Sequence, residues 1–181
     1  DHYVICGYGT KGRSAASTLI SQGTPIDRIV VVEVDPRAAD EATAAGHAVV
    51  LGDCTREEVL RRARVEEANG VIIAVSRDDA AVLATLTVRV LNQRVRVVAS
   101  VREEENLKLL RRSGASLVIT SDEATGRLLG MAIERPHHAA LIEDLLLIGE
   151  GVALGERPVG EDLVGQQAPD RTTRGLRGGR I

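Results

Sequence analysis

The stretch ICGYGTKGR, residues 5–13, is the part of the sequence that decides the expected fold. Gly7, Gly9 and Gly12 stand there in G-x-G-x-x-G spacing, directly after the short apolar run at residues 3–6. In a turn that binds a dinucleotide, the first glycine permits the tight turn. The second lets the backbone approach a pyrophosphate, and the third lets the following helix pack closely on the sheet. The same spacing also occurs in ordinary turns, so its meaning depends on the surrounding chain.

Short runs rich in Val and Ile alternate along the chain with segments of helical periodicity. The expected strands are residues 3–6, 29–33, 47–51, 71–75, 95–100 and 117–120. The expected helices are residues 11–22, 36–45, 56–64, 78–91, 102–113 and 122–135. This alternation predicts a doubly wound α/β fold, that is, a Rossmann-like parallel sheet with helices on both faces. Tyr3 and Tyr8 are the only aromatic residues besides histidine, which agrees with a core of buried aliphatic strands.

The alternation ends near Pro136, and this change predicts two parts. We expect residues 1–135 to form the sheet domain, with its last helix at about 122–135. Residues 136–181 are expected to form a helical linker, a fragment of a C-terminal second lobe and a flexible tail rich in Arg and Gly.

Composition limits the partners and the surroundings of the protein. The net charge of −3 provides no basic field for nucleic acid, and almost no aromatic residue is present on which bases could stack. No signal peptide is evident, and no apolar run reaches the ~20 residues that cross a bilayer, so a soluble piece is expected. Cys6 and Cys54 lie in or beside expected strands, which predicts buried free thiols.

Two acidic residues end or follow expected strands and complete the nucleotide motif. Glu33 ends the second strand about 20 positions after Gly12, where an acidic residue accepts hydrogen bonds from ribose hydroxyls. Its charge would repel a 2′-phosphate, which favours NAD or an adenine nucleotide over NADP. Asp53 follows the third strand and either contacts the adenine or ribose or caps the next helix. A purely structural turn with an empty site is the alternative to all of these roles.

Two further candidate residues, Lys11 and Arg13, belong to the stretch that carries the glycines. Lys11 is expected to be solvated, and Arg13 either contacts phosphate or pairs with an acidic residue across a subunit contact. The expected cofactor-binding residues are Gly7, Tyr8, Gly9, Thr10, Lys11, Gly12, Arg13, Glu33, Asp53 and Cys54. Asp35 is the expected N-cap of the second helix, and Thr55 with Glu58 forms an expected capping box for the third.

The sequence offers no evident catalytic centre. No nucleophile elbow, zinc box or pair of catalytic carboxylates stands out. A dehydrogenase also needs a substrate domain, and little chain follows residue 135 to build one. The histidines are expected at the surface, away from metal-ligand companions: His2, His47, His137 and His138. The nucleotide is therefore expected to act as a signal, and a fragment of an NAD-dependent oxidoreductase is the alternative.

Several segments taken together resemble RCK domains, the regulators of potassium conductance found in potassium channels and Trk/Ktr-type uptake systems. The resemblance runs from residue 2 to about residue 148, in order. The segments are HYVICGYGTKGR, VVVEVDP, GDCT, ANGVIIAV, SVREEENLKLLRRSGASLVIT and SDEATGRLLGMAI. The resemblance implies a ligand-sensing gating domain, not an enzyme, at the cytoplasmic face of the cell membrane. Its implied partner is a potassium pore or the membrane subunit of a potassium transporter.

The resemblance also implies an assembly and a choice of ligands. Lobes pair through the crossover helix at about 122–135, and pairs form an octameric ring. An apolar seam on that helix would consist of Leu128, Leu129, Ala132 and Ile133. Family ligands include NAD(H), ADP or ATP, and calcium, and the intact glycines with Glu33 favour a nucleotide. A calcium-gated domain with an empty nucleotide site is the alternative, for which Asp35 is the candidate metal ligand.

Overall fold

The computed structural model describes residues 2–120, 125–126, 129–131 and 133. Six parallel strands form one sheet in the order β3-β2-β1-β4-β5-β6. The strands are β1 (Tyr3–Cys6), β2 (Ile29–Glu33), β3 (Ala48–Leu51), β4 (Gly70–Ile73), β5 (Arg96–Val101) and β6 (Leu117–Thr120). The helices are α1 (Thr10–Ser21), α2 (Pro36–Ala44), α3 (Glu57–Arg62), α4 (Asp78–Leu91) and α5 (Leu107–Arg112). Three single 3-10 turns accompany them: Ile26–Arg28, Val65–Glu67 and Glu104–Asn106.

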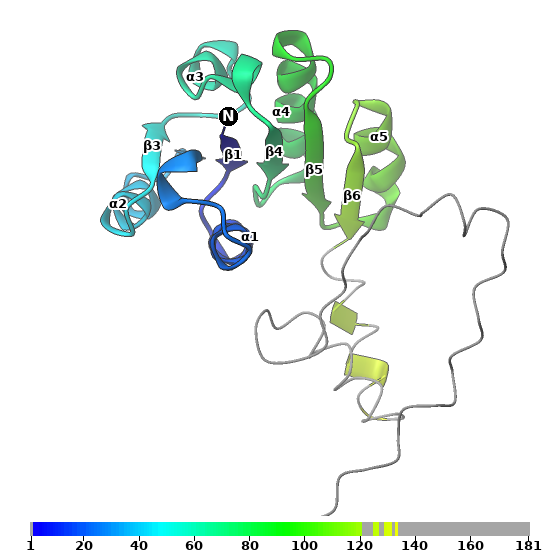
Figure 1. Ribbon diagram of the computed structural model, residues 1–181. Helices are drawn as coiled ribbons and strands as arrows, with labels where there is room; N and C mark the ends of the chain where they lie inside the picture. The colour runs from blue at the N-terminus through cyan, green and yellow to red at the C-terminus, as the bar shows by residue number, and fades with distance from the viewer. Residues whose placement is uncertain (1, 121–124, 127–128, 132, 134–181) are drawn as a thin grey trace, which may run out of the picture.

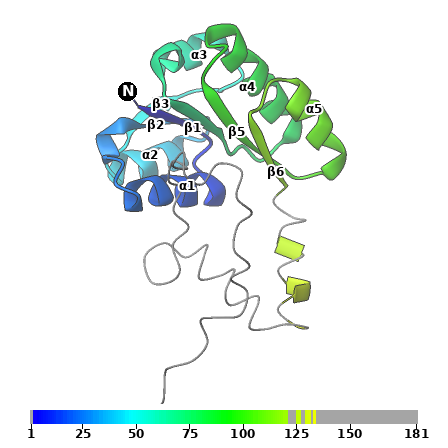
Figure 2. The same cartoon turned by 45° about the vertical axis from the view of Figure 1, so that its right-hand side comes forward.

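The helices cover both faces of the sheet, which confirms the expected Rossmann-like fold. Figures 1 and 2 show α1 and α2 on one face and α3, α4 and α5 on the other. Because side chains alternate along a strand, Val4 and Cys6 of β1 pack with the second group of helices, and Ile5 packs with the first. Small residues such as Ala16 and Ala84 are buried in the helices and let them approach the strands closely.

The start of the fifth helix differs from the sequence prediction because of a contact made elsewhere in the chain. The segment expected as one helix at 102–113 begins as a turn, and α5 itself starts at Leu107. The Asp78 carboxylate accepts hydrogen bonds from the backbone N–H groups of Arg102 (2.9 Å) and Glu103 (3.0 Å), which holds this turn. Burial alone would raise the pKa of Asp78, but these hydrogen bonds and the side chain of Asn106 lower it.

The expected capping box at the third helix is wrong. Arg56 is the N-cap residue of α3 and makes no side-chain cap hydrogen bond. Thr55 instead donates its backbone N–H and its hydroxyl to Asp53 Oδ1, at 2.9 and 2.8 Å. The expected N-cap of α2 is confirmed, since Asp35 accepts the N–H of Arg37 at 3.0 Å and Pro36 follows it.

Much of the C-terminal part lies outside the described residues. Of the helix expected at about 122–135, residues 125–126, 129–131 and 133 are described, and they are helical. Leu129 and Ile133 of the expected seam are exposed, whereas Leu128 and Ala132 lie outside the described residues. The linker, lobe fragment and tail expected at 136–181 lie outside them as well. Among the helices that are described, none has the length and apolar character needed to span a membrane.

Candidate functional site

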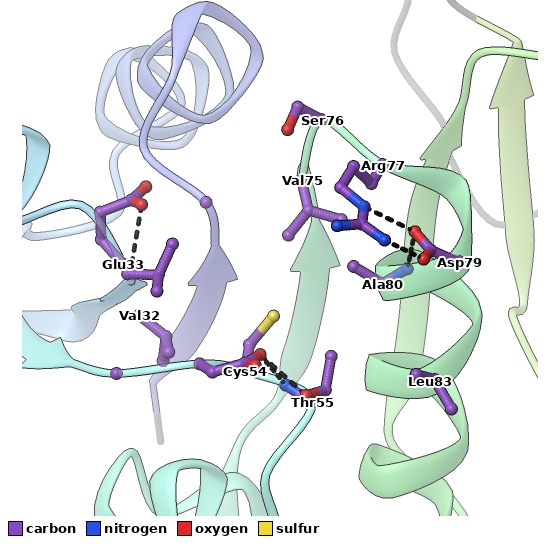
Figure 3. A pocket seen from close by; sticks show the side chains of 14 residues that line it. Val32, Glu33, Cys54, Thr55, Val75, Ser76, Arg77, Asp79, Ala80 and Leu83 are labelled. Carbon is purple, nitrogen blue, oxygen red and sulfur yellow. Dashed lines mark hydrogen bonds and ion pairs between the residues drawn. The ribbon is translucent and has the colours of Figure 1, made fainter.

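A cavity of about 330 Å³ lies at the carboxyl ends of the central strands (Figure 3). The chain leaves β1 toward β2 on one side, while β4 is the neighbour of β1 on the other. This reversal of strand order is where open α/β sheets bind ligands. The lining residues are Gly7, residues 32–34, residues 52–55, residues 75–77, Asp79, Ala80 and Leu83.

The three glycines of the loop differ in what surrounds them. Gly7 has a φ of +94°, and a Cβ built there would lie 3.0 Å from the carbonyl oxygen of Ala74. A Cβ on Gly12 would lie 1.9 Å from the carbonyl oxygen of Gly7. Gly9 has an ordinary φ of −69°, and no atom of the described residues lies within 4 Å of a Cβ built there. The fold therefore requires glycine at positions 7 and 12 but not at position 9.

Glu33 connects the glycine loop to the turn that follows β2. Its Oε2 accepts the backbone N–H of Tyr8 at 2.5 Å, and its Oε1 accepts those of Val34 at 2.7 Å and Asp35 at 2.9 Å. The residue is buried but borders the cavity. A carboxylate offers about four acceptor positions, so three backbone bonds leave capacity for one more donor.

Asp53 and Cys54 both border the cavity, from the loop that follows β3. Asp53 is exposed, and its hydrogen bonds to Thr55 shape this loop rather than cap α3, so the capping role expected as an alternative is wrong. Gly52 precedes them with a positive φ of +158°, and a Cβ there would lie 2.8 Å from Val59. Cys54 is buried, and its thiol is free, as expected.

Tyr8 does not line the cavity with its ring. The ring is buried on the side of α1 and α2 and meets His47 edge-on, with centroids 5.5 Å apart. His47 is itself buried, so the expectation that it lies at the surface is wrong. Its Nδ1 is buried without a hydrogen-bond partner in the described structure, and burial lowers its pKa. The contribution of Tyr8 to the site is its backbone N–H.

Lys11 is not solvated, contrary to the sequence prediction. Its Nζ donates to the Val75 carbonyl oxygen at 3.2 Å and to the Ser100 hydroxyl at 2.8 Å. Since Val75 follows β4 and Ser100 lies in β5, this side chain ties the first turn of α1 to two strands on the far side of β1. Thr10, beside it, is exposed at the start of α1.

Two further candidate residues, Arg13 and Asp35, make contacts within the chain. Arg13 forms an exposed ion pair with Glu41 of α2, at 2.6 Å, and its expected contact with phosphate or with another subunit stays a prediction. Such pairs contribute at most about 1 kcal/mol. Asp35, the candidate calcium ligand, caps α2, and no group of three or more potential metal-ligating side chains is found in the part of the chain that the structure describes.

Sequence reasoning missed one wall of the cavity, formed after β4. Val75, Ser76 and Arg77 lie there, with Ala80 and Leu83 from α4 (Figure 3). Arg77 and Asp79 form an exposed ion pair at this wall, and the hydrogen bond from Arg77 lowers the pKa of Asp79. These residues match no motif. The strand order, in which β4 is the neighbour of β1, would have indicated them, but the alternation of strands and helices does not give that order.

The chain resembles proteins of known name over most of this domain. Residues 3–121 match the family model of the TrkA-N domain. The Probable potassium channel protein 2 of Methanocaldococcus jannaschii is 32% identical over 120 residues, which cover 66% of this chain and 35% of that protein. The solved structure of the GsuK channel bound to NAD has a TM-score of 0.65 and 29% identity, over 80% of this chain and 25% of that chain. GsuK bound to ADP gives a TM-score of 0.64 and 28% identity, over 76% and 35%.

The matches cover only part of the relatives but nearly all of the sheet domain. The chain spans about a third of the length of the first curated relatives. The family model, in contrast, covers every strand of the sheet, from β1 to β6, together with the glycine loop. The chain therefore belongs to the TrkA-N domain family, in agreement with the RCK resemblance of its sequence.

Proposed function

We propose that this domain binds an adenine nucleotide, NAD(H) or ADP/ATP, as a regulatory ligand, and that binding controls a potassium channel or transport system. The observation that carries the ligand proposal is Gly9. The backbone there would accept a Cβ without clash, so packing within the described chain does not explain the glycine. A pyrophosphate that approaches the N-terminus of α1 does explain it, because a Cβ would reduce the space that the anion needs.

The cavity beside the loop suits the adenosine part of such a ligand. Its volume of about 330 Å³ lies within the range of small-molecule sites. Glu33 has one acceptor position for a ribose hydroxyl, and its charge disfavours a 2′-phosphate, so NAD is preferred over NADP. Asp53 is exposed at the wall and is our candidate for a contact with the adenine amino group or the ribose.

The regulatory role is supported by the family and by similar proteins. The solved GsuK structures with NAD and with ADP are of a protein that is 28–29% identical to this chain. In potassium channels and transporters the domains of this family are regulatory and non-catalytic, which agrees with the expectation that this chain is not an enzyme.

Gating would work by differential binding. A ligand can shift a gate only by its difference in affinity between two arrangements of the assembled domains. We propose that these arrangements are those of lobes paired through the helix at about 122–135, in a ring at the cytoplasmic face of the membrane. The partner would be the pore or the membrane subunit.

Titration calorimetry on the 181-residue chain tests the ligand. We expect heat from NAD, NADH, ADP or ATP, and a loss of affinity of about tenfold or more for Gly9→Ala, since one fewer phosphate contact of 1.4 kcal/mol is worth a factor of ten. Ser17→Thr is the matched control, because it also adds one methyl group to α1 at an exposed position.

Four outcomes would contradict the proposal. The first is that no nucleotide binds. The second is that Gly9→Ala binds as tightly as the control. The third is that calcium alone gives a saturable signal, which would favour the calcium-gated alternative. Turnover of NADH on addition of a substrate would favour the oxidoreductase alternative instead.

A further inference from the structure

The sheet has two halves of three strands each, which meet between β1 and β4. In folds with this strand order each half can hold one mononucleotide, and a dinucleotide lies across both. The cavity of about 330 Å³ is lined by residues at the ends of β1, β2 and β3 and, in the second half, by residues between the end of β4 and the first turns of α4. Among the described residues, none from β5, β6 or the loops after them borders it. The cavity thus extends from the first half to α4 and stops short of β5.

Lys11 lies at the carboxyl end of the second half. Its side chain leaves the first turn of α1, and its Nζ donates to the Val75 carbonyl oxygen at 3.2 Å and to the Ser100 hydroxyl at 2.8 Å, both in partly buried surroundings. Val75 is the second residue after β4 and borders the cavity, and Ser100 is the last residue but one of β5. The Lys11 ammonium group therefore lies next to the cavity wall, between the ends of β4 and β5.

The loop that follows β5 is held in the same region by Asp78, the first residue of α4. The Asp78 carboxylate accepts the backbone N–H groups of Arg102 at 2.9 Å and Glu103 at 3.0 Å, and the side-chain amide of Asn106 at 2.9 Å. Hydrogen bonds to an ammonium group or a carboxylate are stronger than those between neutral groups. A ligand group that entered between these elements would have to break such bonds.

We propose that Lys11 is a specificity-determining residue, which makes the site select an adenine mononucleotide such as ADP over the dinucleotide NAD. The inference rests on the proposed function, in which the cavity holds the adenosine part and the phosphates lie at the N-terminus of α1. From there the second nucleoside of NAD would extend over the ends of β4 and β5, where Lys11 lies. NAD has to displace Lys11 from both of its bonds, whereas ADP ends before it reaches them.

A series of ligands that share adenosine and its first phosphate tests the proposal. In the order AMP, ADP, ADP-ribose and NAD, ADP-ribose is the first ligand to carry a second ribose. Titration calorimetry on the 181-residue chain should give an affinity for ADP about tenfold or more above those for ADP-ribose and NAD, since one hydrogen bond to a charged group is worth about that factor. Equal affinities for ADP and NAD would overturn the proposal.

Variants of Lys11 and its partner separate selection from a general structural role. Lys11→Ala removes both bonds and opens space beside β4 and β5, so the ratio of the NAD affinity to the ADP affinity should rise about tenfold. A purely structural role would lower both affinities and leave their ratio unchanged. Lys108→Ala is the matched control, because it removes the same charged side chain from an exposed position on α5, and its ratio should equal that of wild type.

Ser100→Ala keeps the test possible if Lys11→Ala does not fold. It removes one of the two bonds of Lys11 and leaves the lysine in place, so the affinity ratio should rise by less than in Lys11→Ala. An unchanged ratio in Ser100→Ala would contradict the proposal.

The outcomes distinguish this inference from the proposed function. If no ligand of the series binds, the proposed function fails, and the inference fails with it. If NAD and ADP bind equally well and Lys11→Ala leaves their ratio unchanged, the cavity is a nucleotide site in which Lys11 selects nothing. If Lys11→Ala weakens ADP and NAD by the same factor, Lys11 contacts a phosphate or supports the loop, and the proposed selection is wrong while the nucleotide site stands.

Discussion

The Glu33 carboxylate joins the glycine loop to the end of β2, because its Oε2 accepts the backbone N–H of Tyr8 at 2.5 Å. The other oxygen, Oε1, accepts two N–H groups of the following turn. The residue is thus part of the framework of the loop, and it also borders the cavity. One side chain serves structure and proposed ligand binding at once, so a single substitution should affect both.

Replacing Glu33 with Gln should lower stability and ligand affinity together. The new amide group turns one acceptor oxygen into a donor, which leaves at least one buried N–H unpaired at a cost of about 1–3 kcal/mol. Urea unfolding measures the first effect and calorimetry with ADP the second. Glu58→Gln, an exposed change on α3, is the control and should alter neither. A Glu33→Gln chain as stable as wild type would show that the three backbone contacts contribute little.

Gly12→Ala should destabilise the fold far more than Gly9→Ala. The new Cβ at position 12 would overlap the Gly7 carbonyl oxygen, and relief requires α1 to move off the sheet at a cost of about 3 kcal/mol or more. At position 9 the cost is about 0.5–1 kcal/mol, because alanine is a poorer N-cap than glycine. Thermal unfolding of the two variants checks the order, and similar losses would contradict these roles.

Lys11→Met should loosen the contact between α1 and the strands β4 and β5. It removes the bonds to the Val75 carbonyl oxygen and the Ser100 hydroxyl, with an expected loss of about 1–3 kcal/mol for two hydrogen bonds to a charged group. Lys108→Met, on the exposed face of α5, is the matched control and should change stability by less than about 0.5 kcal/mol. The urea unfolding midpoints of the two variants test this prediction. Equal losses of stability would mean that the Lys11 hydrogen bonds do not stabilise the fold.

His47 should make stability depend on pH in the mildly acidic range. Burial lowers its pKa in the folded chain, so the unfolded chain binds a proton more readily. The stability associated with the neutral form of His47 is fully present above the ordinary histidine pKa of about 6.5 and is lost as pH falls below it. Urea midpoints of wild type should therefore fall between about pH 7.5 and pH 5.5, and His47→Gln should weaken that dependence. Identical pH dependence in both chains would refute the assignment.

The strands, most helices and the structural roles of Gly7 and Gly12 were predictable from the sequence, because they follow from local pattern. Short continuous runs of Val and Ile bounded by turn residues favour buried strands, and G-x-G-x-x-G after a strand predicts the turn found at Gly7. The exceptions are instructive. The Asp78 carboxylate holds the turn before α5, and Thr55 bonds to Asp53 instead of capping α3. In the first case a residue 24 positions away replaced the local preference, and in the second a hydrogen bond within the loop competed with the helix cap.

The sequence by itself determined the alternation of strands and helices, the parallel sheet and the glycine loop, since each depends on residues close together in the chain. The tertiary structure alone decided which distant side chains meet. It brought Lys11 to Ser100, buried His47 against Tyr8, and built one wall of the cavity from the residues after β4. The physical reason is that such contacts depend on how strands pair across the sheet and how closely the helices pack, which no local pattern records.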